Sequence, residues 1–163
     1  MHGLPKLDRI DINILSQLQQ NGKLTNVTLA DAVGLSPSPC LQRVKRLEKA
    51  GYIDRYAALI NLKKLSDHVI VFTEVTLADH RHNDFVKFEA DIRKHPHVME
   101  CHMVSGGYDY LLKFVARSVP QYQEIMETIL QRNIGVDKYF SYVVIKSVVP
   151  FNAVPLGRIL DHD

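Results

Sequence analysis

The chain has 163 residues, 46% of them hydrophobic, which suffices for one packed domain or two small ones. No run approaches the roughly 18 apolar residues of a membrane-spanning helix, and the N-terminal residues lack the apolar core of a signal peptide, so we expect a cytoplasmic protein. The two cysteines, Cys40 and Cys101, lie far apart in the sequence, which argues against a disulfide framework and favours buried thiols.

Positive charge is concentrated in the first part of the chain. Residues 1–65 contain ten Lys and Arg against five Asp and Glu, a net charge of +5, whereas the remainder contains ten against thirteen. This asymmetry is typical of a module that meets a polyanion, joined to a second module with another task.

The spacing of apolar residues predicts three helices before residue 52. The first covers 7–20, the second has Thr25 as its N-cap and runs to Val33, and the third follows a sharp corner at Gly34. Gly34 can adopt the left-handed backbone that ends a helix, and Gly51 offers the same conformation after the third helix. This order predicts a helix-turn-helix.

The third helix begins with Ser36 as N-cap and Pro37 at the first helical position, where a missing N–H is harmless. On a helical wheel it has one apolar arc and an opposite arc that is polar and basic. The apolar arc consists of Cys40, Leu41, Val44 and Leu47. The opposite arc includes Ser38, Gln42, Lys45, Arg46 and Lys49.

If the N-terminus of this helix enters the major groove of DNA, its short polar side chains can reach base edges and its cations can bind phosphates. The expected base contacts come from Ser36, Ser38 and Gln42, and the expected phosphate contacts from Arg43, Lys45, Arg46 and Lys49. An ordinary solvated helix face is the alternative, but the preceding corner and the local excess of positive charge favour DNA. Arg43 lies at the edge of the arc, where a salt bridge within the domain is a further alternative.

After the third helix, 53–60 is predicted to be a strand or wing and 61–66 a linker, so we place the domain boundary near Leu65. The resulting division is a helix-turn-helix DNA-binding domain at 1–52, a strand and linker at 53–66, and a second domain at 67–163.

Strand and helix periods alternate in the second domain. Strands are predicted at 68–77, 98–104, 108–116 and 138–149, and helices at 83–94 and 120–131. This βαββαβ order is ferredoxin-like, an α+β arrangement that predicts a four-stranded antiparallel sheet with both helices on one face. Met99, Cys101 and Met103 share one strand face and are expected in the core. The tail, with Pro150 and Pro155, is expected to be an extended arm.

A glycine turn in the second domain is suited to a small zwitterion. Gly106 and Gly107 expose backbone N–H groups that can bind a carboxylate, and Asp109 can pair with an ammonium group. Plain hairpin chemistry is the alternative explanation for this turn.

Catalytic and metal-binding patterns are weak. His95, His97, Cys101 and His102 resemble a metal cluster on paper, but adjacent residues of a strand face opposite ways. The sequence has no P-loop, no dinucleotide fingerprint and no nucleophile elbow. We therefore expect a protein that is not an enzyme and that holds no metal and no cofactor.

Two blocks of the sequence share their motifs with a known family. The first comprises Leu7-Asp8, Asp11, Ile14-Leu15, Leu29-Ala30, residues 33–40, Arg43-Val44, Arg46-Leu47-Glu48 and Gly51-Tyr52-Ile53. The second, 104–112, contains a glycine-aromatic-Asp-aromatic signature. Together they closely resemble the bacterial leucine-responsive regulatory protein (Lrp/AsnC, feast/famine) family, and the resemblance runs from about residue 7 to 149.

This resemblance implies a winged helix-turn-helix DNA-binding domain, a strand linker and a domain that senses an amino acid effector. It also implies dimers formed through the sheet, higher assemblies that are commonly octamers, and effectors bound between dimers near the glycine turn. Carried onto this chain, the effector site would include Met103, Val104, Ser105, Gly106, Gly107, Tyr108 and Asp109, with Ser141 and Val144 from the last strand.

One position departs from the family pattern, because many members carry Asp or Glu after the first glycine and this chain carries Gly107. The departure weakens ammonium recognition or reshapes the pocket. The apolar Met103 and Val144 favour a hydrophobic effector such as leucine or methionine.

We therefore predict a sequence-specific transcriptional regulator whose partners are double-stranded DNA, an amino acid effector and further copies of itself. Two alternatives stay open: a low-specificity protein that organises the nucleoid and, much less favoured, a small enzyme of amino-acid metabolism. The enzyme would need a pair of titratable side chains near the glycine turn, where only Asp109 stands out.

Overall fold

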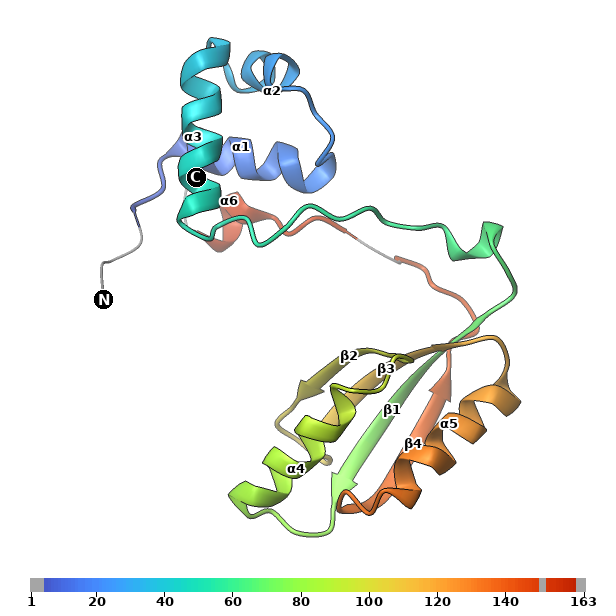
Figure 1. The fold of residues 1–163 in the computed structure, drawn as a ribbon. Helices are drawn as coiled ribbons and strands as arrows, with labels where there is room; N and C mark the ends of the chain where they lie inside the picture. The colour runs from blue at the N-terminus through green and yellow to red at the C-terminus, as the bar shows by residue number, and fades with distance from the viewer. Residues whose placement is uncertain (1–4, 150–151, 161–163) are drawn as a thin grey trace. The chain divides into compact units, whose positions relative to one another are not determined.

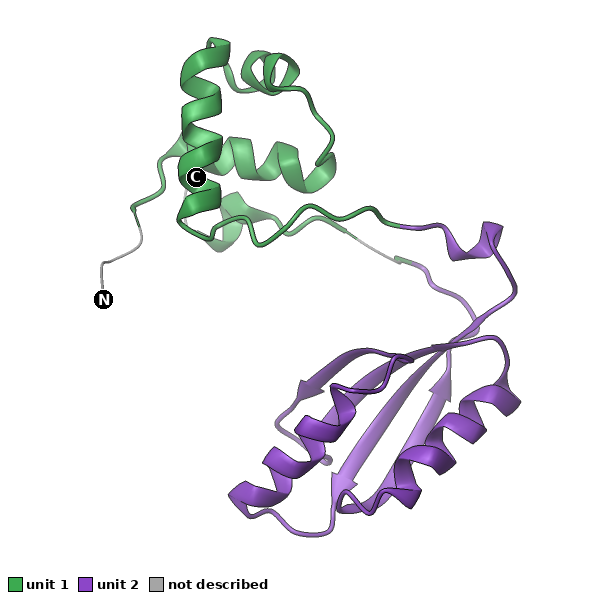
Figure 2. Cartoon of the chain, viewed as in Figure 1, with its two compact units in different colours: residues 1–59, 149–163 green, residues 60–148 purple. Residues whose placement is uncertain are grey.

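The computed structural model describes residues 5–149 and 152–160 and divides into two compact units, coloured separately in Figure 2. The N-terminal unit contains the described residues up to Leu59 together with Val149 and the described tail, 152–160, and the C-terminal unit is Ile60–Val148. The parts of the predicted domains at 1–4, 150–151 and 161–163, Pro150 included, lie outside the described residues. Within the described ranges, no helix is both long and apolar enough to cross a membrane.

Three helices build the N-terminal unit in the predicted order. They are α1 (Arg9–Gln20), α2 (Asn26–Val33) and α3 (Pro37–Lys49). Asp8 and Asp11 form a capping box at the start of α1, in which each side chain accepts the other residue's N–H. Thr25 caps α2, and Gly34 has a φ of 71°, the left-handed conformation that the corner before α3 requires.

A small apolar core holds these helices together. Its buried members are Ile14, Leu15, Leu29, Ala30, Cys40 and Leu47. The tail also contributes, because Leu156 in the short helix α6 (Leu156–Ile159) packs against this core. The sequence division placed the whole tail in the second domain as an extended arm. In the structure, 152–160 group with the N-terminal unit, because apolar burial of Leu156 against the helices outweighs an extended, solvated chain.

The C-terminal unit confirms the predicted α+β order. Its elements are β1 (Val69–Leu77), α4 (His82–Ile92), β2 (Val98–Met103), β3 (Tyr110–Ala116), α5 (Val119–Gln131) and β4 (Val136–Val143), preceded by a short 3-10 helix, η1 (Leu62–Lys64). The strands form one antiparallel sheet in the order β2-β3-β1-β4. Both helices lie on the same face of this sheet, as predicted (Figure 1).

The sheet buries one face and leaves the other open in the single chain. Buried and partly exposed residues alternate along β1 and β3, as expected when helices cover one side. Val71, Leu112 and Phe114 belong to the buried core beneath the helices. The register places Tyr142 opposite Phe72, so both lie on the open face.

Two strand predictions are wrong. Residues 53–60 form no strand, because no other segment pairs with them within the described residues. The last strand ends at Val143 rather than at residue 149, which leaves Ile145 and Val148 exposed. In both segments β-branched and apolar residues are present, but the hydrogen-bonding neighbour that a strand needs is missing from the chain's own sheet.

The expected burial of one strand face is also wrong. Met99 and Met103 are about half exposed, and Cys101 is exposed as well, so only one of the two thiols, that of Cys40, is buried. The physical reason is that β2 is an edge strand of the sheet, so Cys101 and Met103 on its helix side are only partly covered. Met99 lies at an irregularity of the strand register between Val98 and Glu100.

Candidate DNA interface and effector site

The outer face of α3 presents the residues that the sequence assigns to base edges and phosphates. Ser36, Ser38, Gln42, Lys45, Arg46 and Lys49 are all exposed. On the opposite arc Cys40 and Leu47 are buried, whereas Leu41, also expected there, is exposed. Ser36 stands at the N-cap position, but its side chain makes no capping hydrogen bond. The helix therefore lies with its apolar arc in the core and its polar arc in solvent.

Arg43 and Arg46 are bound to carboxylates at the start of α1. Arg43 Nη1 lies 2.6 Å from Asp8 Oδ2 and 2.9 Å from Asp11 Oδ1. Arg46 Nη2 lies 2.5 Å from Asp11 Oδ2. The salt bridge that the sequence left open for Arg43 is therefore present. The one at Arg46 was missed, because nothing in the spacing of charges pairs residues so far apart.

These contacts shift the protonation equilibria of two groups. Hydrogen bonds to Asp8, and then to Asp11, raise the pKa of the Arg43 guanidinium. Desolvation by burial alone would raise the pKa of Asp8, but hydrogen bonds from the Asp11 N–H and Arg43, together with the charge of Arg43, lower it overall. Both groups are thus held in their charged forms.

Tyrosines connect the end of α3 to neighbouring segments. The Tyr56 hydroxyl donates to Glu48 Oε1 at 2.9 Å, and burial together with this carboxylate raises the pKa of Tyr56 to about 12. The Tyr52 hydroxyl donates to the Pro5 carbonyl at 2.7 Å. These contacts fix the chain where it leaves the helices.

The glycine turn between β2 and β3 is open to solvent. Gly106 has a φ of 150°, and a Cβ built at Gly106 or Gly107 would meet no atom within 4 Å. The Val104 N–H donates to the Asp109 carbonyl at 2.9 Å and closes the base of the turn. The backbone at the two glycines is therefore accessible to a small ligand.

The Asp109 carboxylate already has partners. Its Oδ2 accepts the Leu77 N–H at 2.8 Å, and both of its oxygens lie 3.0 Å from His80 Nε2. The side chain is 18% exposed. Asp109 thus supports the end of β1, and an ammonium group would have to share the carboxylate with His80.

The residues of the last strand that were expected at this site lie elsewhere in the single chain. The Ser141 hydroxyl is 2.6 Å from the Tyr122 hydroxyl, which belongs to α5. The Val144 N–H donates to the Ile70 carbonyl at 2.9 Å, near the start of β1, whereas Asp109 contacts its end. Seven residues of strand, about 20 Å, separate these two ends. One copy of the chain therefore does not bring Val144 to the glycine turn.

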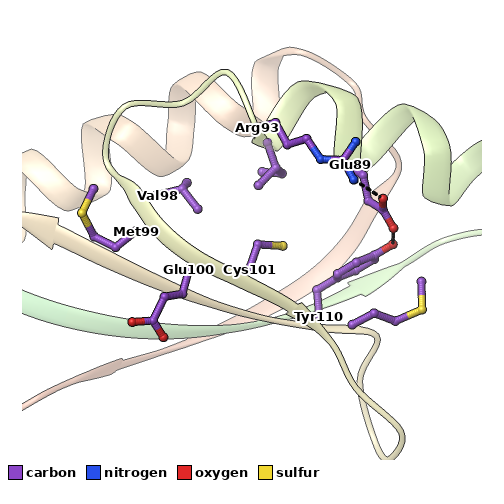
Figure 3. A pocket seen from close by; sticks show the side chains of 9 residues that line it. Glu89, Arg93, Val98, Met99, Glu100, Cys101 and Tyr110 are labelled. Atoms are coloured by element: carbon purple, nitrogen blue, oxygen red, sulfur yellow. Dashed lines mark hydrogen bonds and ion pairs between the residues drawn. The ribbon is translucent and has the colours of Figure 1, made fainter. Parts of the chain in front are cut away.

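A hollow of about 360 Å³ opens beside Met103, between α4 and the edge strand β2 (Figure 3). Its apolar walls come from Ile92, Val98, Met99, Cys101 and Met103. At one side Arg93 Nη2 lies 2.9 Å from Glu89 Oε2, and the Tyr110 hydroxyl donates to Glu89 Oε1 at 3.0 Å. Sequence reasoning assigned only Met103 to a site, because the neighbours of an edge strand depend on the strand order.

Both units match described protein families. Residues 7–54 match the winged helix-turn-helix DNA-binding family, and residues 70–154 match the Lrp/AsnC ligand binding domain. The chain is 45% identical over 150 residues to the leucine-responsive regulatory protein of Haemophilus influenzae, a match that covers 92% of this chain and 90% of that protein. It is 43% identical over 143 residues to the transcriptional regulatory protein DoeX of Halomonas elongata, covering 88% and 90%.

A solved structure supports the same family assignment. The transcriptional regulator NMB0573 of Neisseria meningitidis, determined in complex with L-Met, matches with a TM-score of 0.88 and 36% identity over 94% of this chain and 99% of that one. These relatives are regulators and not enzymes. The chain therefore belongs to the Lrp/AsnC family, as a DNA-binding transcriptional regulator with a ligand-binding domain.

Proposed function

We propose that this protein recognises specific DNA sequences through α3 and changes its assembly when a small amino acid binds to the C-terminal unit. The exposed polar and basic face of α3, directly after a helix-turn-helix corner, is the observation that supports this function. In this proposal Ser36, Ser38 and Gln42 contact base edges, and Lys45 and Lys49 bind phosphates. Arg43 and Arg46 are assigned to phosphates as well, in competition with Asp8 and Asp11.

The effector site that we propose is formed around the glycine turn, 103–109, with Ser141 and Val144 supplied by a neighbouring copy. The distance between Val144 and the turn within one chain supports a site between copies. Leucine and methionine are the first ligands to test, because the neisserial relative is described in complex with L-Met and because Met103 and Val144 are apolar.

Dimers form, in this proposal, through the open face of the sheet. Phe140 and Tyr142 are 57% and 52% exposed there, and Phe72 lies opposite Tyr142. Large apolar side chains gathered on one exposed face are typical of an interface. The family resemblance favours further assembly to an octamer, in the cytoplasm, where the DNA is.

An effector can shift an assembly equilibrium only if it binds one state more tightly than the other. A site completed by residues from two copies meets this condition, because part of its contacts exists only in the assembled state. The amino acid and the higher assembly therefore stabilise each other.

Selection of binding sites from genomic fragments, followed by fluorescence anisotropy, tests the DNA function. Gln42→Ala should reduce the preference for selected over random sequence, with about 1–3 kcal/mol lost on the selected site. Lys49→Gln should weaken binding to all sequences about equally. Equal affinities for selected and random DNA would instead favour the nucleoid-organising alternative.

Titration with leucine and methionine, with alanine and aspartate for comparison, tests the effector function. Thermal melts report binding, and sedimentation velocity reports the assembly state. A hydrophobic amino acid should raise the melting temperature and shift the sedimentation profile. If no amino acid changes either quantity, the regulator acts without such an effector.

A further inference from the structure

The only charged side chain that is completely buried in the described residues is that of Asp11, at 0% exposure. Its carboxylate accepts hydrogen bonds from Arg43 Nη1 at 2.9 Å, from Arg46 Nη2 at 2.5 Å and from the Asp8 N–H at 3.1 Å. The N–H contact is all that the capping box at α1 requires. The two guanidinium groups therefore do something beyond the cap: they bind α3 to α1.

The cluster of Asp8, Asp11, Arg43 and Arg46 has no net formal charge, because two carboxylates face two guanidinium groups. Two of the four cations on α3 assigned to phosphates are thus neutralised by carboxylates of the protein itself. Arg46 is 46% exposed in its side chain and lies on the same helix as Lys45 and Lys49. Arg46 therefore lies where it could contact DNA, but its charge is already paired with that of Asp11.

This compensation matters for DNA, because sequence-independent affinity grows with the number of phosphates that a protein neutralises. Each such contact adds about 0.9 to the slope of the logarithm of affinity against the logarithm of salt concentration. A guanidinium that already holds a buried carboxylate has less to gain from a phosphate, since leaving Asp11 unpaired in the core is costly.

We propose that Asp11 is a positioning residue of the DNA interface, which ties Arg46 and Arg43 to α1 and withholds their charge from non-specific binding to phosphates. This inference rests on the proposed role of α3 in DNA binding and specifies which of its cations bind phosphates. Non-specific affinity then comes chiefly from Lys45 and Lys49, and Arg46 holds α3 at a fixed angle on α1. The pairing of these arginines with Asp11 favours sequence selectivity, because it lowers the affinity for DNA of any sequence and does not change the residues that face bases.

The test is the salt dependence of binding of the full chain to a random duplex of about 30 base pairs, with the selected site measured in parallel. Asp11→Asn removes the buried charge and keeps the shape, so the slope should steepen by about 0.9, an extra loss of roughly 3-fold in affinity between about 50 and 200 mM salt. The preference for the selected site should fall. Asp11→Asn combined with Arg46→Gln should restore the slope of the unmodified protein.

Lys49→Gln and Lys45→Gln are the matched controls, each expected to flatten the slope by about 0.9. If these controls flatten the slope while folded Asp11→Asn leaves it unchanged, Asp11 has only a structural role. The inference about Asp11 then fails, while the proposed role of α3 in DNA binding stands. If the double variant flattens the slope as Lys49→Gln does, Arg46 binds phosphate in the unmodified protein and the inference is overturned. If neither lysine variant changes the slope, α3 does not lie on DNA, and the proposed function fails with it.

Circular dichroism melts establish that each variant is folded at the temperature of measurement. Should Asp11→Asn alone not fold, the double variant decides, because it removes the buried carboxylate together with the guanidinium group of Arg46, while Arg43 keeps its ion pair with Asp8. An unchanged slope in the double variant supports the proposal, and a flattened slope contradicts it.

Discussion

Gln19 in α1 and Val154 in the tail exchange two hydrogen bonds, although they lie 135 residues apart in the sequence. The Val154 N–H donates to Gln19 Oε1 at 3.1 Å, and Gln19 Nε2 donates to the Val154 carbonyl at 3.2 Å. The DNA-binding unit thus contains both ends of the described chain. Along the chain it is connected to the C-terminal unit twice, through the linker before β1 and through the segment after β4.

Replacing Leu156 by Ala should destabilise the N-terminal unit by about 1–2 kcal/mol, because this partly buried side chain packs on the core of the helices. The matched control is Ile159→Ala on the same short helix, where the side chain is 62% exposed and a loss below about 0.5 kcal/mol is expected. Amide hydrogen exchange in α1 measures both effects locally. Equal losses in the two variants would show that Leu156 contributes no more packing than the exposed Ile159.

The elements of this fold could be predicted because their signals are local. Apolar spacing identified α1, α4 and α5, and Thr25 and Gly34 marked the ends of α2 through caps that depend on neighbouring residues only. The helix-turn-helix and the βαββαβ order followed from these elements. The exposed arc of α3 followed from the helical period alone.

The contacts of the candidate sites depend on residues far apart in the sequence and could not be predicted in this way. Asp11 meets Arg46 across 35 positions, and no periodicity marks that pair. The exposure of Met103 follows from the edge position of β2, which the spacing of residues within that strand does not reveal. Ile145 is a β-branched residue of the kind that favours strands, but β4 ends before it and its side chain is fully exposed.

A chain of hydroxyl groups that leads to the buried Thr73 should contribute measurably to the stability of the C-terminal unit. The Tyr122 hydroxyl lies 2.7 Å from Thr73 Oγ1, which is fully buried, and 2.6 Å from Ser141 Oγ. Tyr122→Phe leaves the Thr73 hydroxyl without this partner and should cost about 1–3 kcal/mol in urea unfolding. The control is Tyr142→Phe, which removes the hydrogen bond from the Tyr142 hydroxyl to Glu74 on the open face of the sheet and should cost less than Tyr122→Phe. Similar costs for both would mean that the buried group finds another partner.

The two glycines of the turn should differ in what they tolerate. Gly106 has a φ of 150°, which side chains rarely adopt, so Gly106→Ala should destabilise the C-terminal unit by about 1–3 kcal/mol. Gly107 has no such conformation, and a Cβ there would meet open space, so Gly107→Ala should be close to neutral. Thermal melts compare the two, and equal losses would contradict the assignment of strain to Gly106.

Gly107→Glu should fold as well as the unmodified protein and restore the acidic group that many family members carry after the first glycine. If the turn binds the effector, a new carboxylate beside it should tighten ammonium binding and lower the concentration of methionine needed for half of the thermal shift. Gly107→Gln is the matched control, because it adds the same bulk without charge. Identical titrations for the two variants would place the ammonium group away from this position.

The stability of the N-terminal unit should fall in acid through Asp8. Burial alone would raise the pKa of this carboxyl, but hydrogen bonds from the Asp11 N–H and Arg43 lower it below the unfolded value of 3.8. The folded state therefore binds fewer protons, so the stabilisation is fully present above about pH 4 and is lost as the pH falls through the folded pKa. Asp8→Asn keeps a good N-cap and removes only the charge. It should be less stable than the unmodified protein at neutral pH, and the difference in urea unfolding should close below about pH 4. A difference that stays constant with pH would show that the side chain acts through its cap hydrogen bond alone.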